Sequence, residues 1–314
     1  MRTLDKISFV ILLGFLVSFS CKKDLKFREY LTENVIIVVM DGPRYSETWG
    51  DSTHRNIPRM SNQLSEFGII STQFYNIGPT YTLAGHTAIT TGFYQEIDNS
   101  GKELPSYPSI FQYWNAKYVN SADRSWIIAS KDKLQVLNNC QFDEFNNKYE
   151  PSTDCGISGL GSGYRDDSIT FNMVIKVLSE NHPKLTLINF REPDYSAHSN
   201  NWDNYLKGIK STDEYIYQIW EYIQHDFYYK GKTTLFVTND HGRHLDSIAG
   251  GFASHGDSCL GCRHINFYAY GPDFKHGVIL NNKRELIDIS ATVSELMHLN
   301  MEFGKGDVMY ELFE

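Results

Sequence analysis

The sequence predicts an α/β fold in which a mostly parallel central β-sheet is flanked by helices on both faces and carries a small loop-rich cap. Two observations support this fold class. Short apolar runs rich in β-branched and aromatic residues recur along the chain, as is typical of strands buried on both faces. Between them, Ser168–Leu178 and Thr212–Ile223 show the helical spacing of apolar residues. Strands that alternate with helices favour a parallel sheet covered by helices.

The predicted strands are short and are bounded by polar or turn-forming residues, which favours strands over buried helices. They span Asn34–Met40, Trp126–Ala129, Leu185–Phe190, Thr233–Thr238 and His264–Tyr270. A further helix is expected to begin at Thr82, within the segment TYTLAGHTAITTG.

Length and charge limit the classes of function. With 314 residues, of which 41% are hydrophobic, the chain can bury a large core. It shows no internal repeat, low-complexity tract or long linker, so we expect one domain over residues 21–314. The net charge of −9, without clustered Lys and Arg, argues against binding of nucleic-acid polymers. It does not exclude a small phosphorylated substrate, because local cations can reverse the field at one site.

The N-terminus has the features of an export signal. Arg2 and Lys6 precede the apolar run Ile7–Phe19, which is too short to span a bilayer comfortably. The following SCKKD resembles the end of bacterial lipoprotein signals. We therefore expect residues 1–20 to be a signal peptide and Cys21 to carry a lipid anchor that holds the domain in the cell envelope, in the periplasm or at the outer membrane. The alternative is an ordinary cleaved signal or an uncleaved anchor.

The remaining cysteines form an even set in a compartment expected to be oxidising. They are Cys140, Cys155, Cys259 and Cys262. The simplest disulfide pairs are Cys140–Cys155 and Cys259–Cys262. A zinc site made of thiolates is the alternative, and we expect disulfides because only one close-spaced CxxC is present.

Polar side chains follow three of the predicted strands. Asp41 follows the first strand, Asp194 and His198 follow the third, and Asp240 and His241 follow the fourth. A single Asp after a strand is most often a helix cap or a turn residue. The carboxyl ends of parallel strands meet at one edge of the sheet, where ligands bind in open α/β folds. Together these side chains therefore predict a metal site at that edge.

The motifs VVMDG, TYTLAGHTAITTG, REPDYSAH, VTNDHG and SHG…YAYGPDFK occur in an order and spacing that cover nearly the whole mature chain. This set resembles the alkaline phosphatase superfamily, specifically its nucleotide pyrophosphatase/phosphodiesterase and phosphonoacetate hydrolase branch. The resemblance implies an alkaline phosphatase-like fold and two Zn²⁺ ions. The implied ligands of one ion are Asp41, Thr82, Asp240 and His241, and those of the other are Asp194, His198 and His255. Mixed nitrogen and oxygen ligands suit catalytic zinc, and the three histidines favour zinc over magnesium.

The same resemblance assigns the nucleophile. In a pattern resembling TxTxxxH the nucleophile lies four residues before a histidine, which gives Thr82 before His86. We interpret His86 as structural support and the competing Thr80 as a turn residue. A threonine hydroxyl becomes nucleophilic when a metal ion lowers its pKa, and the start of a helix adds a positive dipole end beside phosphoryl oxygens. The implied reaction is hydrolysis of a phosphoric ester through a covalent phosphothreonine.

Three further residues are candidates for substrate binding. Asn99 follows the nucleophile helix, where related enzymes place an asparagine on a phosphoryl oxygen, and Lys131 and Lys133 resemble the KDKL segment of phosphonoacetate hydrolases. The alternative for the two lysines is a solvated charged turn. The segment Asn138–Arg165 is expected to roof the pocket.

We therefore expect a phosphodiesterase or phosphatase. The alternatives are a hydrolase of carbon–phosphorus bonds in phosphonates and a non-enzymatic binding lipoprotein on the same fold. Specificity depends on loops that the motifs do not define, so the leaving group stays open.

Overall fold

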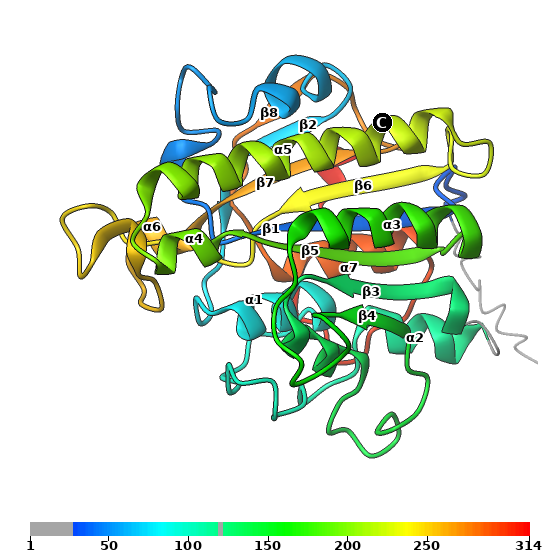
Figure 1. The fold of residues 1–314 in the computed structure, drawn as a ribbon. Helices are drawn as coiled ribbons and strands as arrows, with labels where there is room; N and C mark the ends of the chain where they lie inside the picture. Colours follow the sequence, from blue (N-terminus) through cyan, green and yellow to red (C-terminus); the bar gives the residue numbers. More distant parts are fainter. Residues whose placement is uncertain (1–27, 119–121) are drawn as a thin grey trace, which may run out of the picture.

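The computed structural model describes residues 28–118 and 122–314 (Figure 1). The predicted signal peptide at residues 1–20 and the anchor at Cys21 lie outside the described residues. Within the described part of the chain, no helix is both long and apolar enough to cross a membrane.

One sheet of nine strands organises the described residues (Figure 1). The strands follow the order β4-β3-β5-β1-β6-β7-β2-β8, and β9 also pairs with β2. Only β7 is antiparallel to its neighbours, β6 and β2, so the sheet is mostly parallel, as predicted. The strands are β1 (Asn34–Asp41), β2 (Ile69–Tyr75), β3 (Ser125–Ala129), β4 (Ser152–Cys155), β5 (Leu185–Pro193), β6 (Thr233–Thr238), β7 (His264–Tyr270), β8 (Val278–Leu280) and β9 (Arg284–Glu285).

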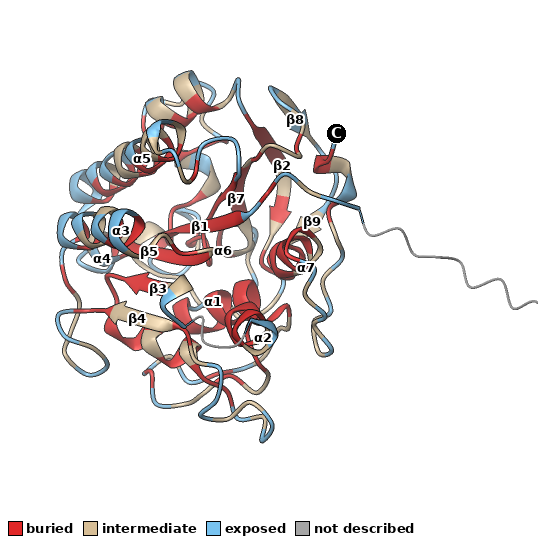
Figure 2. Ribbon diagram, turned by 90° about the vertical axis from the view of Figure 1, so that its right-hand side faces the viewer, coloured by how far each residue is buried: buried red, intermediate tan, exposed pale blue. Residues whose placement is uncertain are grey.

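Helices cover both faces of the sheet, which confirms the predicted layers. Helices α3 and α5 lie on one face, and α1, α2 and α7 lie on the other (Figures 1 and 2). The helices are α1 (Thr82–Thr91), α2 (Ile110–Lys117), α3 (Asp167–Asn181), α4 (Asp194–His198), α5 (Trp202–His225), α6 (Leu260–Arg263) and α7 (Ile287–Leu296). Shorter helical turns span Tyr45–Glu47, Met60–Leu64, Ala122–Arg124, Asp132–Asn138, Gly251–Ala253 and Tyr310–Leu312.

Strand β1 divides the core into two apolar clusters. Because side chains alternate along a strand, Val35, Ile37 and Val39 enter the cluster on the α1 and α7 side, whereas Ile36 and Val38 enter the cluster on the α3 and α5 side. All five are fully buried. Truncation of such a side chain to Ala costs about 2–5 kcal/mol of stability. The apolar sequence of this central strand therefore fixes Asp41, its last residue, at the carboxyl edge of the sheet.

Helix α5 covers β5 and β1 through one apolar stripe. The side chain of Asn201 caps its first turn by accepting a hydrogen bond from the Asn204 amide at 2.9 Å. Ile209, Ile216 and Ile223 recur at intervals of seven residues and are buried, which is the spacing of one face of a helix. Packing of this face holds the β5–α4 corner that carries Asp194.

The predicted disulfides are absent from the described residues. Cys140, Cys155, Cys259 and Cys262 are all free thiols. The thiol of Cys140 points to the carbonyl oxygen of Phe142 at 4.0 Å, and that of Cys155 points to the carbonyl oxygen of Ile127 at 3.7 Å. Each of these two sulfurs thus has its own backbone acceptor. The expectation based on an even number of cysteines was wrong for this structure.

The segment Asn138–Arg165 does more than roof a pocket. It contains β4, which pairs in parallel with β3 and extends the sheet by one strand. Tyr164, close to the end of the segment, is the residue that lines the cavity described below.

Candidate active site

Four neighbouring strands direct polar side chains to the same edge of the sheet. In the order β3-β5-β1-β6, Lys131 lies two residues after β3 and Asp194 directly after β5. Asp41 ends β1, and Asp240 lies two residues after β6. All four side chains are buried. The structure therefore brings together Asp41, Asp194 and Asp240, which were predicted at this edge, and adds Lys131 to them.

The first cluster consists of Asp41, Asp240 and His241, none of which is exposed. The Nδ1 of His241 donates to the carbonyl oxygen of Gly242 at 2.9 Å, which leaves a lone pair on Nε2. This Nε2 lies 3.5 Å from Oδ2 of Asp240 and 3.7 Å from Oδ1 of Asp41. Neither the His241 Nε2 nor the Asp240 Oδ2 has a hydrogen-bond partner.

Of the three side chains, His241 and Asp240 thus present two buried acceptors to each other without a donor, which is unfavourable unless a cation lies between them. Burial, followed by the neighbouring Asp240 carboxylate, raises the pKa of Asp41, so that negative charge is unfavourable here without a further cation. The donor set of two carboxylates and one imidazole suits zinc. The first cluster therefore fits the metal ion that the motifs imply.

The second cluster consists of Asp194, His198 and His255. The Oδ1 of Asp194 lies 3.3 Å from His198 Nε2 and 3.4 Å from His255 Nε2, and the two Nε2 atoms are 3.1 Å apart. Zinc bonds of about 2.0–2.1 Å at tetrahedral angles require ligand separations of about 3.3 Å. The second cluster therefore has the dimensions of a zinc site.

The protonation of His255 also suits a metal ligand. Its Nδ1 donates to the carbonyl oxygen of Thr80 at 2.8 Å, so that Nε2 faces the cluster with a lone pair. Burial, followed by the neighbouring His241 ring, lowers the pKa of His255 to about 2. The two rings are stacked with centroids 3.9 Å apart, which joins the first cluster to the second. A neutral imidazole is the form that binds metal.

Lys131 connects both clusters to the predicted nucleophile. Its Nζ donates to Asp41 Oδ1 at 2.8 Å, to Asp194 Oδ2 at 2.7 Å and to Thr82 Oγ1 at 3.1 Å. Burial disfavours the ammonium, but the surrounding carboxylates outweigh it and raise the pKa of Lys131. Burial likewise opposes ionisation of Asp194, and Lys131 with its other partners holds the pKa of Asp194 well below its usual value. Lys131 is thus a buried positive charge and not part of a solvated turn.

Asn99 and Lys133 lie at the same site. The Oδ1 of Asn99 accepts hydrogen bonds from the Leu83 amide at 3.1 Å and from Lys133 Nζ at 3.0 Å. Burial, and then the like charge of Lys131, lowers the pKa of Lys133 to about 8. Both residues line a cavity of about 440 Å³ at the carboxyl edge of the sheet. The lining residues are Thr82, Asn99, Lys131, Lys133, Tyr164, Asp194, Tyr195, His198, Ser199 and His255.

Arg243 has no role that its sequence context predicted. Its fully buried guanidinium is paired with Oδ1 of Asp194, and it also donates to the carbonyl oxygens of Phe252 and, at 3.0 Å, Ala253. Asn189 was missed as well, and its Nδ2 donates to Asp41 Oδ2 at 3.0 Å. Asn189 could have been noticed in the sequence because it is a polar residue inside the apolar strand LTLINF.

His86 supports the helix that carries the predicted nucleophile. Its Nδ1 lies 2.8 Å from the carbonyl oxygen of Thr82, to which it donates, and 3.3 Å from Oδ2 of Asp240. Its Nε2 lies 3.2 Å from the Asn189 amide nitrogen. These contacts surround His86 with protein partners, in agreement with its interpretation as a supporting residue.

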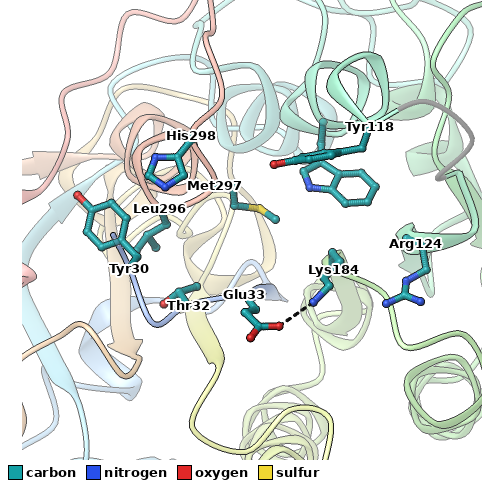
Figure 3. Close-up of a pocket in the computed structure, with 10 residues that line it drawn as sticks. Tyr30, Thr32, Glu33, Tyr118, Arg124, Lys184, Leu296, Met297 and His298 are labelled. Carbon is teal, nitrogen blue, oxygen red and sulfur yellow. Dashed lines mark hydrogen bonds and ion pairs between the residues drawn. The ribbon is translucent and has the colours of Figure 1, made fainter. Parts of the chain in front are cut away.

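A second, somewhat larger cavity of about 520 Å³ lies at the opposite edge of the sheet (Figure 3). Its lining includes Thr32 and Glu33 just before β1, Arg124 just before β3 and Lys184 just before β5. Glu33 and Lys184 form an ion pair at 3.1 Å. None of the predicted site residues lines this cavity. The chemistry therefore selects the smaller cavity as the candidate active site, although size alone would favour the other.

The protein has an α/β fold with two candidate metal sites at the carboxyl edge of its sheet. A sequence model of the metalloenzyme superfamily matches residues 126–301. The chain therefore belongs to the metalloenzyme superfamily, whose fold is of the alkaline phosphatase type. A curated relative is the 2,3-bisphosphoglycerate-independent phosphoglycerate mutase of Gracilaria tenuistipitata var. liui, which is 28% identical over 130 residues. The match covers 40% of this chain and only 24% of the mutase.

Solved structures show the same fold. Murine ectonucleotide pyrophosphatase/phosphodiesterase 5, an inactive variant in complex with AMP, aligns with a TM-score of 0.64 and 13% identity over 90% of this chain and 100% of that chain. The phosphonate monoester hydrolase of Silicibacter pomeroyi aligns with a TM-score of 0.62 and 11% identity over 88% and 76% of the two chains. An alkaline phosphatase superfamily protein from Vibrio parahaemolyticus aligns with a TM-score of 0.62 and 15% identity over 87% and 68%. At these identities the likeness establishes the fold alone.

Proposed function

We propose that this protein is a two-zinc hydrolase of phosphoric esters, a phosphodiesterase or phosphatase, with Thr82 as its nucleophile. The observation that carries the proposal is the position of Thr82 Oγ1. It lies at the first residue of α1, in the cavity, 3.1 Å from the buried ammonium of Lys131. The names of the structural neighbours, a phosphodiesterase and a phosphonate monoester hydrolase, support the same class of reaction.

Seven side chains would hold the two ions. The first ion would be held by Asp41, Thr82, Asp240 and His241, and the second by Asp194, His198 and His255. Zinc in such sites neutralises phosphoryl oxygens and lowers the pKa of a bound hydroxyl group.

The protein itself would favour negative charge on Thr82. The positive end of the α1 dipole and the Lys131 ammonium both stabilise an anion at Oγ1. Because the pKa of Lys131 is raised, this residue acts as a fixed positive charge and not as a base. In the first step the bond from Thr82 Oγ1 to phosphorus forms and the bond from phosphorus to the leaving oxygen breaks, while the hydroxyl proton of Thr82 passes through solvent to the leaving oxygen. Water then releases the phosphoryl group from phosphothreonine and restores the hydroxyl.

Asn99 and Lys133 would orient the substrate. The Oδ1 of Asn99 is occupied by two donors, so its amide group can only donate to a ligand in the cavity. The Lys133 ammonium lies beside it and provides a charge-assisted hydrogen bond to a phosphoryl oxygen. These two groups would hold the nonbridging oxygens of a small phosphorylated substrate.

A substrate panel tests the proposal. The purified zinc-loaded protein is assayed with an aryl phosphate monoester, an aryl phosphodiester and phosphonoacetate, in parallel with Thr82→Ala. Turnover of an ester that is lost in Thr82→Ala supports the proposal. Cleavage of phosphonoacetate alone would instead support the phosphonate hydrolase, and binding of phosphate without turnover of any compound would support a binding lipoprotein.

The site of action is also a proposal. If Cys21 carries a lipid anchor, the enzyme would act on small phosphorylated compounds at the cell envelope. Metabolic labelling with a fatty acid, lost in Cys21→Ala, is the corresponding measurement.

A further inference from the structure

A second group of metal-binding side chains lies beside the candidate active site. It consists of His244, Asp257, Cys259 and Cys262, whose ligand atoms all lie within 4.8 Å of one another. His244 comes from the loop after β6, and the other three come from the segment that leads through α6 into β7. None of the seven proposed active-site ligands belongs to this group.

The imidazole of His244 points into this group, and its Nε2 atom has no hydrogen-bond partner. Its Nδ1 donates to the carbonyl oxygen of Ala249 at 2.7 Å, so Nε2 presents a lone pair. The side chain is only 6% exposed, and Nε2 is buried without a hydrogen-bond donor. It faces Oδ2 of Asp257 at 3.2 Å, which is also an acceptor. Two acceptors in this position require a cation or a proton between them.

The other three ligands are held in position by the backbone. The Oδ1 of Asp257 accepts a hydrogen bond from the Cys259 amide at 2.8 Å, which turns Oδ2 towards His244. Cys259 is the N-cap of α6 and Cys262 lies inside that helix, so the CxxC spacing brings both sulfurs to one side. Tetrahedral zinc with bonds of about 2.0–2.3 Å needs ligand separations of about 3.3–3.8 Å. Movement of each ligand atom by about 0.6–0.9 Å therefore closes even an arrangement with every separation at the 4.8 Å limit.

We propose that these four side chains form a structural zinc site that is separate from the two active-site ions. Two thiolates and an imidazole favour zinc over magnesium or calcium, which prefer oxygen. Four protein ligands complete a tetrahedron and leave no open position, as in structural sites. This site does not depend on the reaction proposed above.

The zinc ion would join two loops that carry active-site residues. The Gly242 amide donates to the carbonyl oxygen of Cys262 at 2.7 Å, and the His244 amide donates to that of Ser254 at 3.0 Å. A Cβ on Gly242 would lie 2.0 Å from the carbonyl oxygen of Gly261, so the two backbones are in close contact. His255 lies in one of these loops. The proposed zinc would therefore hold this active-site histidine in position.

Cobalt substitution of the full-length protein tests this inference. The proposed active-site ligands are nitrogen and oxygen only, so absorption from thiolate-to-cobalt charge transfer reports the new site alone. We expect this absorption in the cobalt-loaded wild type and its loss in Cys259→Ser, together with one metal ion fewer per chain by elemental analysis. Cys259 is partly exposed, so this variant is expected to fold.

Two controls distinguish this site from the others. Cys140→Ser changes a buried thiol elsewhere and should keep the absorption. Asp240→Asn should also keep the absorption, although this variant loses metal from the active site. This difference separates the present test from that of the proposed function. Absence of the absorption in a wild-type protein that has bound cobalt would overturn the proposal. So would a Cys259–Cys262 disulfide found by peptide mapping of the protein as isolated.

Discussion

The ammonium of Lys131 lies 2.7 Å from Oδ2 of Asp194 and bridges from there to Oδ1 of Asp41 at 2.8 Å. Each carboxylate belongs to a different acceptor cluster. Both lysines were expected to bind the substrate, and both line the cavity. The Lys131 ammonium is held by two buried carboxylates, whereas the Lys133 ammonium donates to the neutral side chain of Asn99. The two lysines should therefore behave differently on mutation.

Lys133→Met should reduce kcat/KM for an aryl phosphate monoester more than for an aryl phosphodiester. A monoester carries nearly two negative charges and a diester one, so loss of a cation is more costly for the monoester. A charge-assisted hydrogen bond of about 1.5–3 kcal/mol corresponds to a change of about tenfold or more. Lys131→Met should instead reduce both rates together. An unchanged monoester-to-diester ratio in Lys133→Met would show that Lys133 does not contact the phosphoryl group.

Thr82→Ala should reduce turnover by about a thousandfold or more, because removal of a nucleophile disables the catalytic unit as a whole. Thr80→Ala is the matched control. The Thr80 hydroxyl donates to the carbonyl oxygen of Asp257 at 2.9 Å, and this residue does not line the cavity. Steady-state kinetics of both variants with the best substrate of the panel show which of the two threonines is the nucleophile. Full activity in Thr82→Ala with loss in Thr80→Ala would reverse the assignment.

Asp240→Asn should lower the metal content of the protein and abolish activity. The Oδ2 of Asp240 lies buried without a hydrogen-bond partner, which is the position of a ligand that lacks its ion. Chelation of the wild type should give the same loss of activity and a lower Tm, both reversed by zinc, because an ion that binds only the folded state stabilises it. Asp143→Asn, at an exposed carboxylate, is the control for elemental analysis. Full activity of a metal-free protein would exclude the two-zinc site.

Asp213 predicts a pH dependence of stability far from the active site. Its carboxylate is buried under the turn at Met60 and accepts hydrogen bonds from the amides of Arg59 and Met60 at 2.7 and 2.9 Å. Burial raises the pKa of Asp213 to about 7. A carboxyl group whose pKa is raised on folding stabilises the folded state in full when the pH lies below the pKa of the unfolded chain, about 3.9. This stabilisation is lost as the pH rises through the pKa of the folded protein.

The stability of the wild type should therefore fall relative to that of Asp213→Asn as the pH rises from about 5 to about 8. Thermal unfolding of both proteins across this range is the measurement. Asp203→Asn, on the exposed side of the same helix, should follow the wild type. Parallel curves for wild type and Asp213→Asn would show that this carboxylate is ionised in the folded protein throughout.

The sheet was largely predictable because its central strands are continuous apolar runs. The five predicted strands and the three predicted helices are present, whereas β2 was not predicted, since Ser71, Thr72 and Gln73 interrupt its apolar pattern. Helix α7 was missed as well. Helix α1 is buried on every side and has no amphipathic pattern, so only the motif around Thr82 indicated where it begins.

The site was predictable only in part, for a related reason. A carboxylate that directly follows a strand has its position fixed by the strand, so Asp41, Asp194 and Asp240 could be placed at one edge. Long side chains such as Lys131 and Arg243 reach partners that only the packing determines. The disulfide expectation failed because the number of cysteines carries no information on where each sulfur points.

Chemical trapping of the phosphorylated enzyme tests the central claim most directly. The zinc-loaded protein is mixed with the ester that it turns over fastest, quenched in acid during turnover, digested and examined by mass spectrometry. The account predicts a phosphoryl group on the peptide that contains Thr82, located on that residue by fragmentation and absent from Thr82→Ala. An unmodified Thr82 peptide throughout turnover, or a phosphoryl group on Thr80 in its place, would contradict the account.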